Sequence, residues 1–150
     1  MERFKHISGV HLILLREGKI LLLRRANTGF ADGQYNVPAG HIDGNETIRE
    51  AASREAFEEA RVVIRPEDLH VVHVTHRYKP DGERVDFYLT TDTWQGEPSI
   101  GEPDQCDDLG WFDFNALPEN TVAYIRFALE KFKAGETFSE FDWEKRLKTS

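Results

Sequence analysis

The hydrophobic pattern opens with two nearly continuous apolar runs, residues 9–15 and 20–24, which are separated by a short polar segment containing Gly18. A glycine between two such runs favours a tight turn, so the pair predicts a β-hairpin. Runs without polar alternation are typical of strands that are covered on both faces. We therefore expect both strands near the centre of a sheet flanked by helices.

Later segments predict three more strands and a final helix. They are a second hairpin made of residues 69–78 and 85–94, a short aromatic strand at residues 109–114, and a helix within residues 117–135. The tail, residues 137–150, interleaves aromatic and charged residues. We expect this tail either to pack back on the domain or to take part in a dimer interface.

Three histidines, His70, His73 and His76, lie on the first strand of the second predicted hairpin. Successive side chains on a strand point to opposite faces, so His73 points away from the other two. We therefore do not expect a metal site made of these three histidines.

The strongest helical pattern covers residues 46–60, which lack Gly and Pro, with Asn45 as the expected N-cap. At about 100° per residue, one face of this helix starts apolar and becomes acidic. That face carries Ile48, Ala51 and Ala52, followed by Glu55, Glu58 and Glu59. Two interpretations are open at this point: a solvated acidic face, or an inward cluster of carboxylates.

An inward carboxylate cluster needs a positive partner, because the charges repel one another and lose hydration on burial. These side chains also lie toward the negative end of the helix dipole. Clustered oxygen ligands suit a hard divalent cation, so the second interpretation predicts a site for Mg²⁺, or for Mn²⁺ as an alternative.

Gly40, Glu46 and residues 54–62 (REAFEEARV) closely resemble the Nudix box, G-x5-E-x7-R-E-U-x-E-E-x-G-U with U apolar. One constrained position departs, since Arg61 stands where the family has a glycine that leaves the helix with positive φ. A non-glycine residue in that conformation costs about 1 kcal/mol. The resemblance implies an α/β/α sandwich with a mixed β-sheet over most of the chain.

The resemblance also implies a set of site residues. The metal ligands would be the Gly40 carbonyl, Glu55, Glu59 and Glu58. The catalytic residues would be Glu55, Glu58, Glu59 and Glu102. Glu46 and Arg54 would have a structural role. Glu102 is the best match to a glutamate that reaches the metal site from a later loop in MutT-like members, with Glu97 as the alternative. The general base is not assigned to one glutamate.

Three residues are candidates for substrate binding by the same resemblance. Arg24 and Arg25 lie where MutT-like members contact substrate phosphate, and strand alternation allows at most one of them to point into the site. Asn120 lies near a base-reading asparagine of some members, but it is also a natural N-cap of the final helix, and we favour the cap.

Composition fits one compact enzyme domain over residues 1–150, because 39% hydrophobic residues in a chain of this length can form a proper core. A net charge of -8 without a basic tract disfavours long nucleic acids and anionic membranes as partners. The single cysteine, Cys106, excludes an internal disulfide. The first residues lack the apolar core of a signal peptide, so we expect a cytoplasmic protein.

For function, the resemblance implies a Mg²⁺-dependent hydrolase that cleaves the pyrophosphate bond of a nucleoside diphosphate linked to another moiety. Its MutT-like features favour a nucleoside triphosphate pyrophosphohydrolase. The alternatives are a dinucleoside polyphosphate, ADP-ribose or nucleotide-sugar pyrophosphatase and, in another class, a catalytically silent nucleotide-binding module. Homodimers are frequent in the family and are a candidate assembly here.

Overall fold

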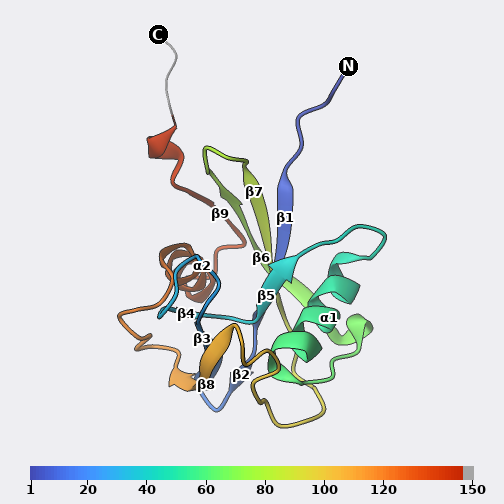
Figure 1. Ribbon diagram of the computed structural model, residues 1–150, viewed down its shortest axis with the longest axis vertical. Helices are drawn as coiled ribbons and strands as arrows, with labels where there is room; N and C mark the ends of the chain where they lie inside the picture. Colours follow the sequence, from blue (N-terminus) through green and yellow to red (C-terminus); the bar gives the residue numbers. More distant parts are fainter. Residues whose placement is uncertain (147–150) are drawn as a thin grey trace.

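The computed structural model describes residues 1–146 and contains two β-sheets between two helices (Figure 1). The first sheet has the order β5-β1-β7-β6-β9 and consists of β1 (Ile7–Ile13), β5 (Ala39–His41), β6 (His70–Arg77), β7 (Arg84–Thr90) and β9 (Phe138–Phe141). The second consists of β2 (Leu15–Arg16), β3 (Lys19–Arg25), β4 (Tyr35–Asn36) and β8 (Cys106–Asp113). The helices are α1 (Ile48–Ala60) and α2 (Ala123–Lys133), with short 3₁₀ turns η1 (Pro66–Asp68) and η2 (Trp143–Lys145).

The predicted α/β/α arrangement with a mixed sheet is confirmed. In the first sheet β1 and β7 are parallel, as are β6 and β9, whereas β6 and β7 are antiparallel. Leu12 belongs to the apolar cluster under α1 and Ile13 to the cluster under α2. Adjacent residues of β1 therefore face the two helical layers, which lie on opposite sides of the sheets in Figure 1.

The first predicted hairpin is only partly correct. Both apolar runs are buried, as expected, but β1 pairs with β5 and β7, whereas β3 pairs with β2, β4 and β8 in the other sheet. The turn at Gly18 joins only the short β2 to β3. The hydrophobic pattern predicted burial correctly, but burial alone does not identify the partner of a strand.

The start of α1 differs from the prediction. Thr47, not Asn45, is the N-cap: its side chain accepts the backbone N–H of Glu50, and the Glu50 carboxylate accepts the N–H of Thr47. This capping box satisfies two backbone donors at once, which a cap at Asn45 would not do. Asn45 instead has a φ of 57°, in the turn before the helix.

Arg61 keeps the conformation that glycine has in the Nudix pattern. Its φ is 59°, its N–H donates to the Phe57 carbonyl, and its guanidinium donates to the Gly101 carbonyl at 3.1 Å. The departure from glycine therefore leaves the end of the helix unchanged and adds a contact to the following loop.

The last part of the described chain returns to the domain. β9 adds a parallel strand to the edge of β6, and the Trp143 indole donates to the His76 carbonyl, so the tail packs back through residue 146. Residues 147–150 of the predicted tail lie outside the described residues.

The predicted cap at Asn120 is wrong, because Val122 precedes α2 and the Asn120 amide donates to the Gly33 carbonyl instead. No helix within residues 1–146 has both the length and the apolar character needed to cross a membrane.

Candidate active site

Two of the three carboxylates of the box, those of Glu55 and Glu59, project from α1 toward β5. Glu55 is well covered, with 12% of its side chain exposed, and accepts from the Arg54 guanidinium at 2.8 Å. Glu58 contacts the same nitrogen of Arg54 at 3.3 Å. Glu59 accepts the backbone N–H of Ala39 at 3.1 Å. The second half of the helix therefore presents an acidic cluster in which Glu55 and Glu59 point inward, while Glu58, with 45% of its side chain exposed, lies at the edge next to solvent.

Arg54 connects this cluster to the segment before the helix. Its Nε and Nη2 donate to the two oxygens of Glu46 at 3.1 and 2.8 Å, and Nη2 also donates to the His41 carbonyl. The hydrogen bonds from Arg54 are the main reason why the pKa of Glu46 falls to about 2. These contacts join the helix, its N-terminal loop and β5, and they support a structural role for Glu46 and Arg54.

Gly40 leaves the space in which the Glu55 carboxylate lies. A side chain at this position would overlap the carboxylate, so the backbone of β5 approaches α1 more closely than any other residue would allow. This close approach brings a peptide group next to the acidic cluster. The atoms available here as metal ligands are carboxylate and carbonyl oxygens, a set that fits Mg²⁺ or Mn²⁺.

Burial shifts the proton affinity of two of these carboxylates. The pKa of Glu55 is raised to about 7 and that of Glu59 to about 8, mainly because burial removes water from the charged carboxylates. The negative charges of neighbouring glutamates, including Glu102, raise both pKa values further. The Arg54 guanidinium and the Ala39 N–H act in the opposite direction without cancelling the effect. The cluster thus lacks sufficient positive charge of its own, as expected of a cation site.

The loop after β7 brings Glu102 to the same place. The Gly101 N–H donates to the Glu59 carbonyl at 2.9 Å, and a side chain on Gly101 would overlap the Glu58 carbonyl. This tight contact holds the loop against the end of α1, and Glu102 lines a small cleft together with Glu59. Glu97, the alternative, forms an ion pair with Arg16 at 2.8 Å.

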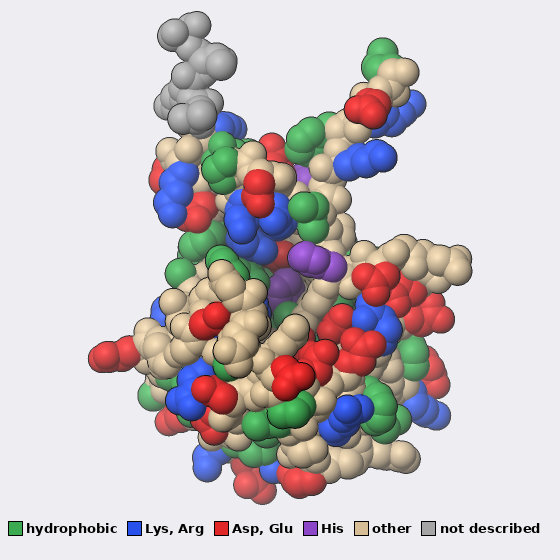
Figure 2. Space-filling view, viewed as in Figure 1, with side chains coloured by type: hydrophobic (Ala, Val, Ile, Leu, Met, Phe, Trp, Pro, Cys, Tyr) green, Lys and Arg blue, Asp and Glu red, His purple; other side chains and the backbone are tan. Residues whose placement is uncertain are grey.

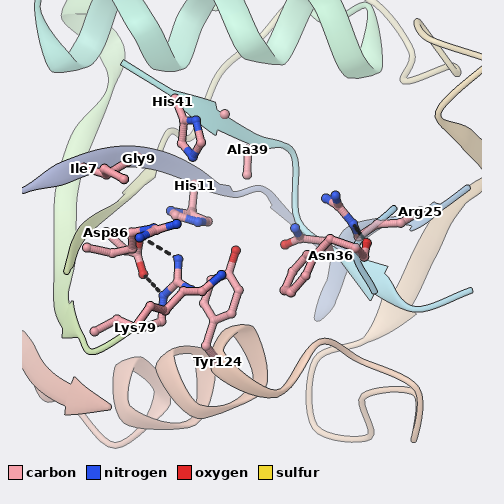
Figure 3. Close-up of a pocket in the computed structure, with 14 residues that line it drawn as sticks. Ile7, Gly9, His11, Arg25, Asn36, Ala39, His41, Lys79, Asp86 and Tyr124 are labelled. Carbon is pink, nitrogen blue, oxygen red and sulfur yellow. Dashed lines mark hydrogen bonds and ion pairs between the residues drawn. The ribbon is translucent and has the colours of Figure 1, made fainter. Parts of the chain in front are cut away.

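Two clefts meet beside the acidic cluster. The larger has a volume of about 340 Å³ and the smaller about 120 Å³, and Arg25, Asn36 and Ala39 line both. Figure 3 shows His11, Asp86 and Lys79 at one end of the larger cleft and Arg25 with Asn36 at the other. In Figure 2, acidic side chains border one side of this hollow and basic side chains lie above it.

A family comparison decides the relationship that the box suggested. The NUDIX domain model matches residues 5–132. The chain belongs to the Nudix family. Among curated relatives, it is 33% identical to an NAD-capped RNA hydrolase of Chromobacterium violaceum over 115 residues, which cover 77% of this chain and 41% of the relative. It is 31% identical to an ADP-ribose pyrophosphatase of Methanocaldococcus jannaschii over 107 residues, which cover 71% of this chain and 62% of the relative.

A solved structure agrees with this assignment. The crystal structure of a MutT Nudix hydrolase from Burkholderia pseudomallei matches with a TM-score of 0.76 and 27% identity, covering 84% of this chain and 97% of that one. The chain spans less than two thirds of the length of the two curated relatives. The shared region is therefore the Nudix domain itself.

The two candidate arginines differ in their surroundings. Arg24 is bound to Asp107 at 2.7 Å and reaches only the smaller cleft. Arg25 donates to the Phe30 carbonyl and to Thr28, and it lines both clefts. Asn120, the third substrate candidate, is not among the described residues that line either cleft.

Sequence reasoning missed the polar floor of the larger cleft of this Nudix domain. Arg77 and Asp86 form a buried ion pair at 2.8 Å, and the Arg77 guanidinium lies 3.7 Å from the centre of the Tyr124 ring. His11 Nδ1 and Asn36 Oδ1 are buried and have no hydrogen-bond partner among the described residues. The available signal was weak: His11 is the one polar residue inside an apolar run, and Arg77 and Asp86 occupy inward positions of paired strands.

The raised pKa values predict how the metal-free protein responds to pH. Glu55 and Glu59 bind protons more tightly when folded than at the ordinary value of 4.5, so their protonation stabilises the fold. That stability is complete below about pH 4.5 and is lost as pH rises through about 7 and 8. Each tenfold difference in proton affinity corresponds to about 1.4 kcal/mol.

Thermal unfolding of the metal-free protein between pH 5 and pH 9, with and without Mn²⁺, measures this effect. Stability should fall with pH in the absence of metal, and the gain from Mn²⁺ should grow over the same range, because metal replaces protons. Glu59→Gln should flatten the metal-free profile, whereas Glu97→Gln should not. A profile for the unsubstituted protein that rises between pH 6 and pH 8.5 would contradict the assignment.

Proposed function

We propose that the chain is a Mg²⁺-dependent hydrolase that cleaves the pyrophosphate bond of a nucleoside diphosphate linked to another moiety. The observation that carries this proposal is the meeting of Glu55, Glu58 and Glu59 with the close approach of Gly40, beside clefts lined by Arg25. An acidic cluster next to a basic cleft suits a phosphate substrate whose charge is shared between a cation and a guanidinium. Mn²⁺ is the alternative ion.

The residues of this chain would divide the chemistry among them. Glu55, Glu58, Glu59 and the Gly40 carbonyl would hold the cation, which supplies charge neutralisation of the phosphate oxygens and a lowered pKa of the attacking water. Arg25 would orient a phosphate between the two clefts, and Arg24 would support it from the smaller one. Glu102, on the loop after β7, or one of the box carboxylates would accept the proton from water.

For the substrate, we propose a nucleoside triphosphate first, split into a monophosphate and pyrophosphate, in keeping with the MutT-like features and the similarity to the Burkholderia MutT protein. A second candidate is ADP-ribose or another dinucleotide-like compound. It is favoured by the two clefts, because a pyrophosphate held at Ala39 could extend one half into each. The larger cleft alone is within the range of about 300–1,000 Å³ that small-molecule sites occupy.

The test is hydrolysis of a panel of nucleotides, with and without Mg²⁺, by the unsubstituted protein and Glu59→Gln. The panel contains nucleoside triphosphates, oxidised nucleotides, diadenosine polyphosphates, ADP-ribose, nucleotide sugars and NAD-capped RNA. Pyrophosphate plus a monophosphate from triphosphates supports the first candidate, and two monophosphates from ADP-ribose support the second. If folded protein that still binds Mn²⁺ hydrolyses none of these compounds, the result would favour a catalytically silent nucleotide-binding module.

Three broader expectations stay predictions. They are a single Nudix domain over residues 1–150, a cytoplasmic location, and small nucleotides instead of long nucleic acids as partners. The NAD-capped RNA in the panel tests the last of these directly, because the Chromobacterium relative is named for that substrate. A homodimer remains a candidate that sedimentation analysis would test.

Glu102→Gln should lower kcat by about 10²-fold, the lower end of what a positioned proton acceptor contributes. The carboxylate lines the smaller cleft with Glu59, so loss of its basicity affects the site directly. The matched control is Glu97→Gln on the same loop, which removes only the exposed pair with Arg16 and should leave kcat unchanged. Equal rates for the two variants would exclude Glu102 from the reaction.

A further inference from the structure

A second cluster of metal-ligating side chains lies on the first sheet, away from the acidic cluster. Its members are His6, one residue before β1, His76 on β6, and Glu83, one residue before β7. These strands are neighbours in the order β1-β7-β6, and the start of β1 lies beside the β6–β7 hairpin in Figure 1. The sheet therefore brings together three residues that are far apart in the sequence.

The cluster and the larger cleft are on opposite faces of this sheet. Ile7, Arg77 and Arg84, which directly follow the three cluster residues, all line the larger cleft. His76 and Arg77 are neighbours on β6 and therefore point to opposite faces, so the cluster that His76 forms with His6 and Glu83 faces the α1 side. A ligand bound by the cluster would therefore lie outside the larger cleft.

The ligand atoms of the cluster have the spacing of a metal site. His6 Nε2 and His76 Nε2 are 3.2 Å apart, and Glu83 Oε1 is 3.7 Å from the first and 3.5 Å from the second. Bonds of about 2.0–2.2 Å in a tetrahedral zinc site place ligand atoms about 3.3–3.6 Å apart. The three distances between ligand atoms are thus within a few tenths of an ångström of those around a shared ion.

Aromatic contacts hold both imidazoles in position. The Trp143 ring packs on His76 with centroids 4.5 Å apart, and its indole N–H donates to the His76 carbonyl. Phe4 packs edge-on against His6 at 5.1 Å. The exposed fractions of the side chains are 37% for His6 and 27% for His76 and Glu83, so an ion can enter from solvent.

We propose that His6, His76 and Glu83 bind a divalent transition-metal ion, Zn²⁺ by preference, with solvent in the remaining position. Two imidazoles and one carboxylate are ligands that Zn²⁺ and its first-row neighbours prefer, whereas Mg²⁺ prefers oxygen ligands. The ion ties the N-terminal segment to the β6–β7 hairpin, and it is chemically and spatially separate from the proposed catalytic cation.

The test uses the full chain without a histidine tag, stripped of metal and held in excess Mg²⁺ to occupy the oxygen-ligand site. Titration with Zn²⁺, and with Co²⁺ followed by its visible absorption, should show one tight site per chain. His6→Ala and His76→Gln should each weaken it by more than about 100-fold, because loss of a direct ligand exceeds the 10–100-fold cost of losing an outer partner. Glu83→Gln should also weaken binding.

Matched variants separate this site from the others. His70→Ala removes an exposed histidine from the same strand and should leave the affinity unchanged, as should Glu59→Gln at the catalytic site. Bound Cu²⁺ should quench the fluorescence of Trp143, and Trp143→Phe should remove that quenching. Tight Zn²⁺ binding that survives in both histidine variants, or its absence from the unsubstituted protein, would overturn the proposal.

Discussion

Glu59→Gln is expected to lower kcat by about 10²- to 10⁴-fold, the loss of several kcal/mol of metal-based stabilisation of the transition state. Glu59 is the most deeply placed carboxylate of the box, and the Ala39 N–H fixes one of its oxygens beside Gly40. An amide of the same shape keeps a hydrogen bond to Ala39 but has no charge for the cation. The effect should therefore be on turnover and metal affinity, with the fold intact.

Two measurements distinguish this effect from simple unfolding. At pH 8 without metal, Glu59→Gln should be at least as stable as the unsubstituted protein, because a buried amide avoids the cost of a buried carboxylate. Its activity should also need more Mg²⁺ to reach half of its maximum. Near-normal turnover with unchanged Mg²⁺ dependence would exclude Glu59 from the metal site.

The box could be interpreted from sequence because its geometry is local. Glu55, Glu58 and Glu59 are three and four residues apart on one helix, so they share a face once the helix exists. The N-cap was missed because Asn45 and Thr47 are both good cap residues, and the choice depends on Glu50 completing a capping box. Such an error moves the start of a helix without moving its acidic face.

The parts that the sequence did not predict depend on pairing between distant strands. Residues 9–15 and 20–24 have the same apolar character, yet β1 and β3 belong to different sheets. His76 was judged against His70 and His73 on its own strand, whereas its partner in the structure is His6, one residue before β1. Neither result follows from periodicity, because periodicity specifies faces and not neighbours.

Periodicity could not predict the ion pair between Arg77 and Asp86 either, because the two residues lie on different strands. Its loss should have the largest effect on the free energy of unfolding. Arg77→Met is expected to lower the free energy of unfolding by about 3–5 kcal/mol, because it leaves a buried carboxylate without its partner. Asp86 has only 2% of its side chain exposed and Arg77 11%, so water cannot replace the guanidinium without opening the sheet. Urea unfolding at pH 7 measures the loss.

Two further variants test whether the missing charge causes this loss. Arg84→Met removes the guanidinium directly opposite Arg77 in the strand register, but its partners are the exposed Asp81 and the Gly82 carbonyl, so no buried charge is left behind and the cost should stay below about 1 kcal/mol. The double variant Arg77→Met with Asp86→Asn should regain part of the stability, because no charge is then left buried. If the double variant is as unstable as the sum of the single ones, packing against Tyr124, and not the ion pair, holds this part of the cleft together.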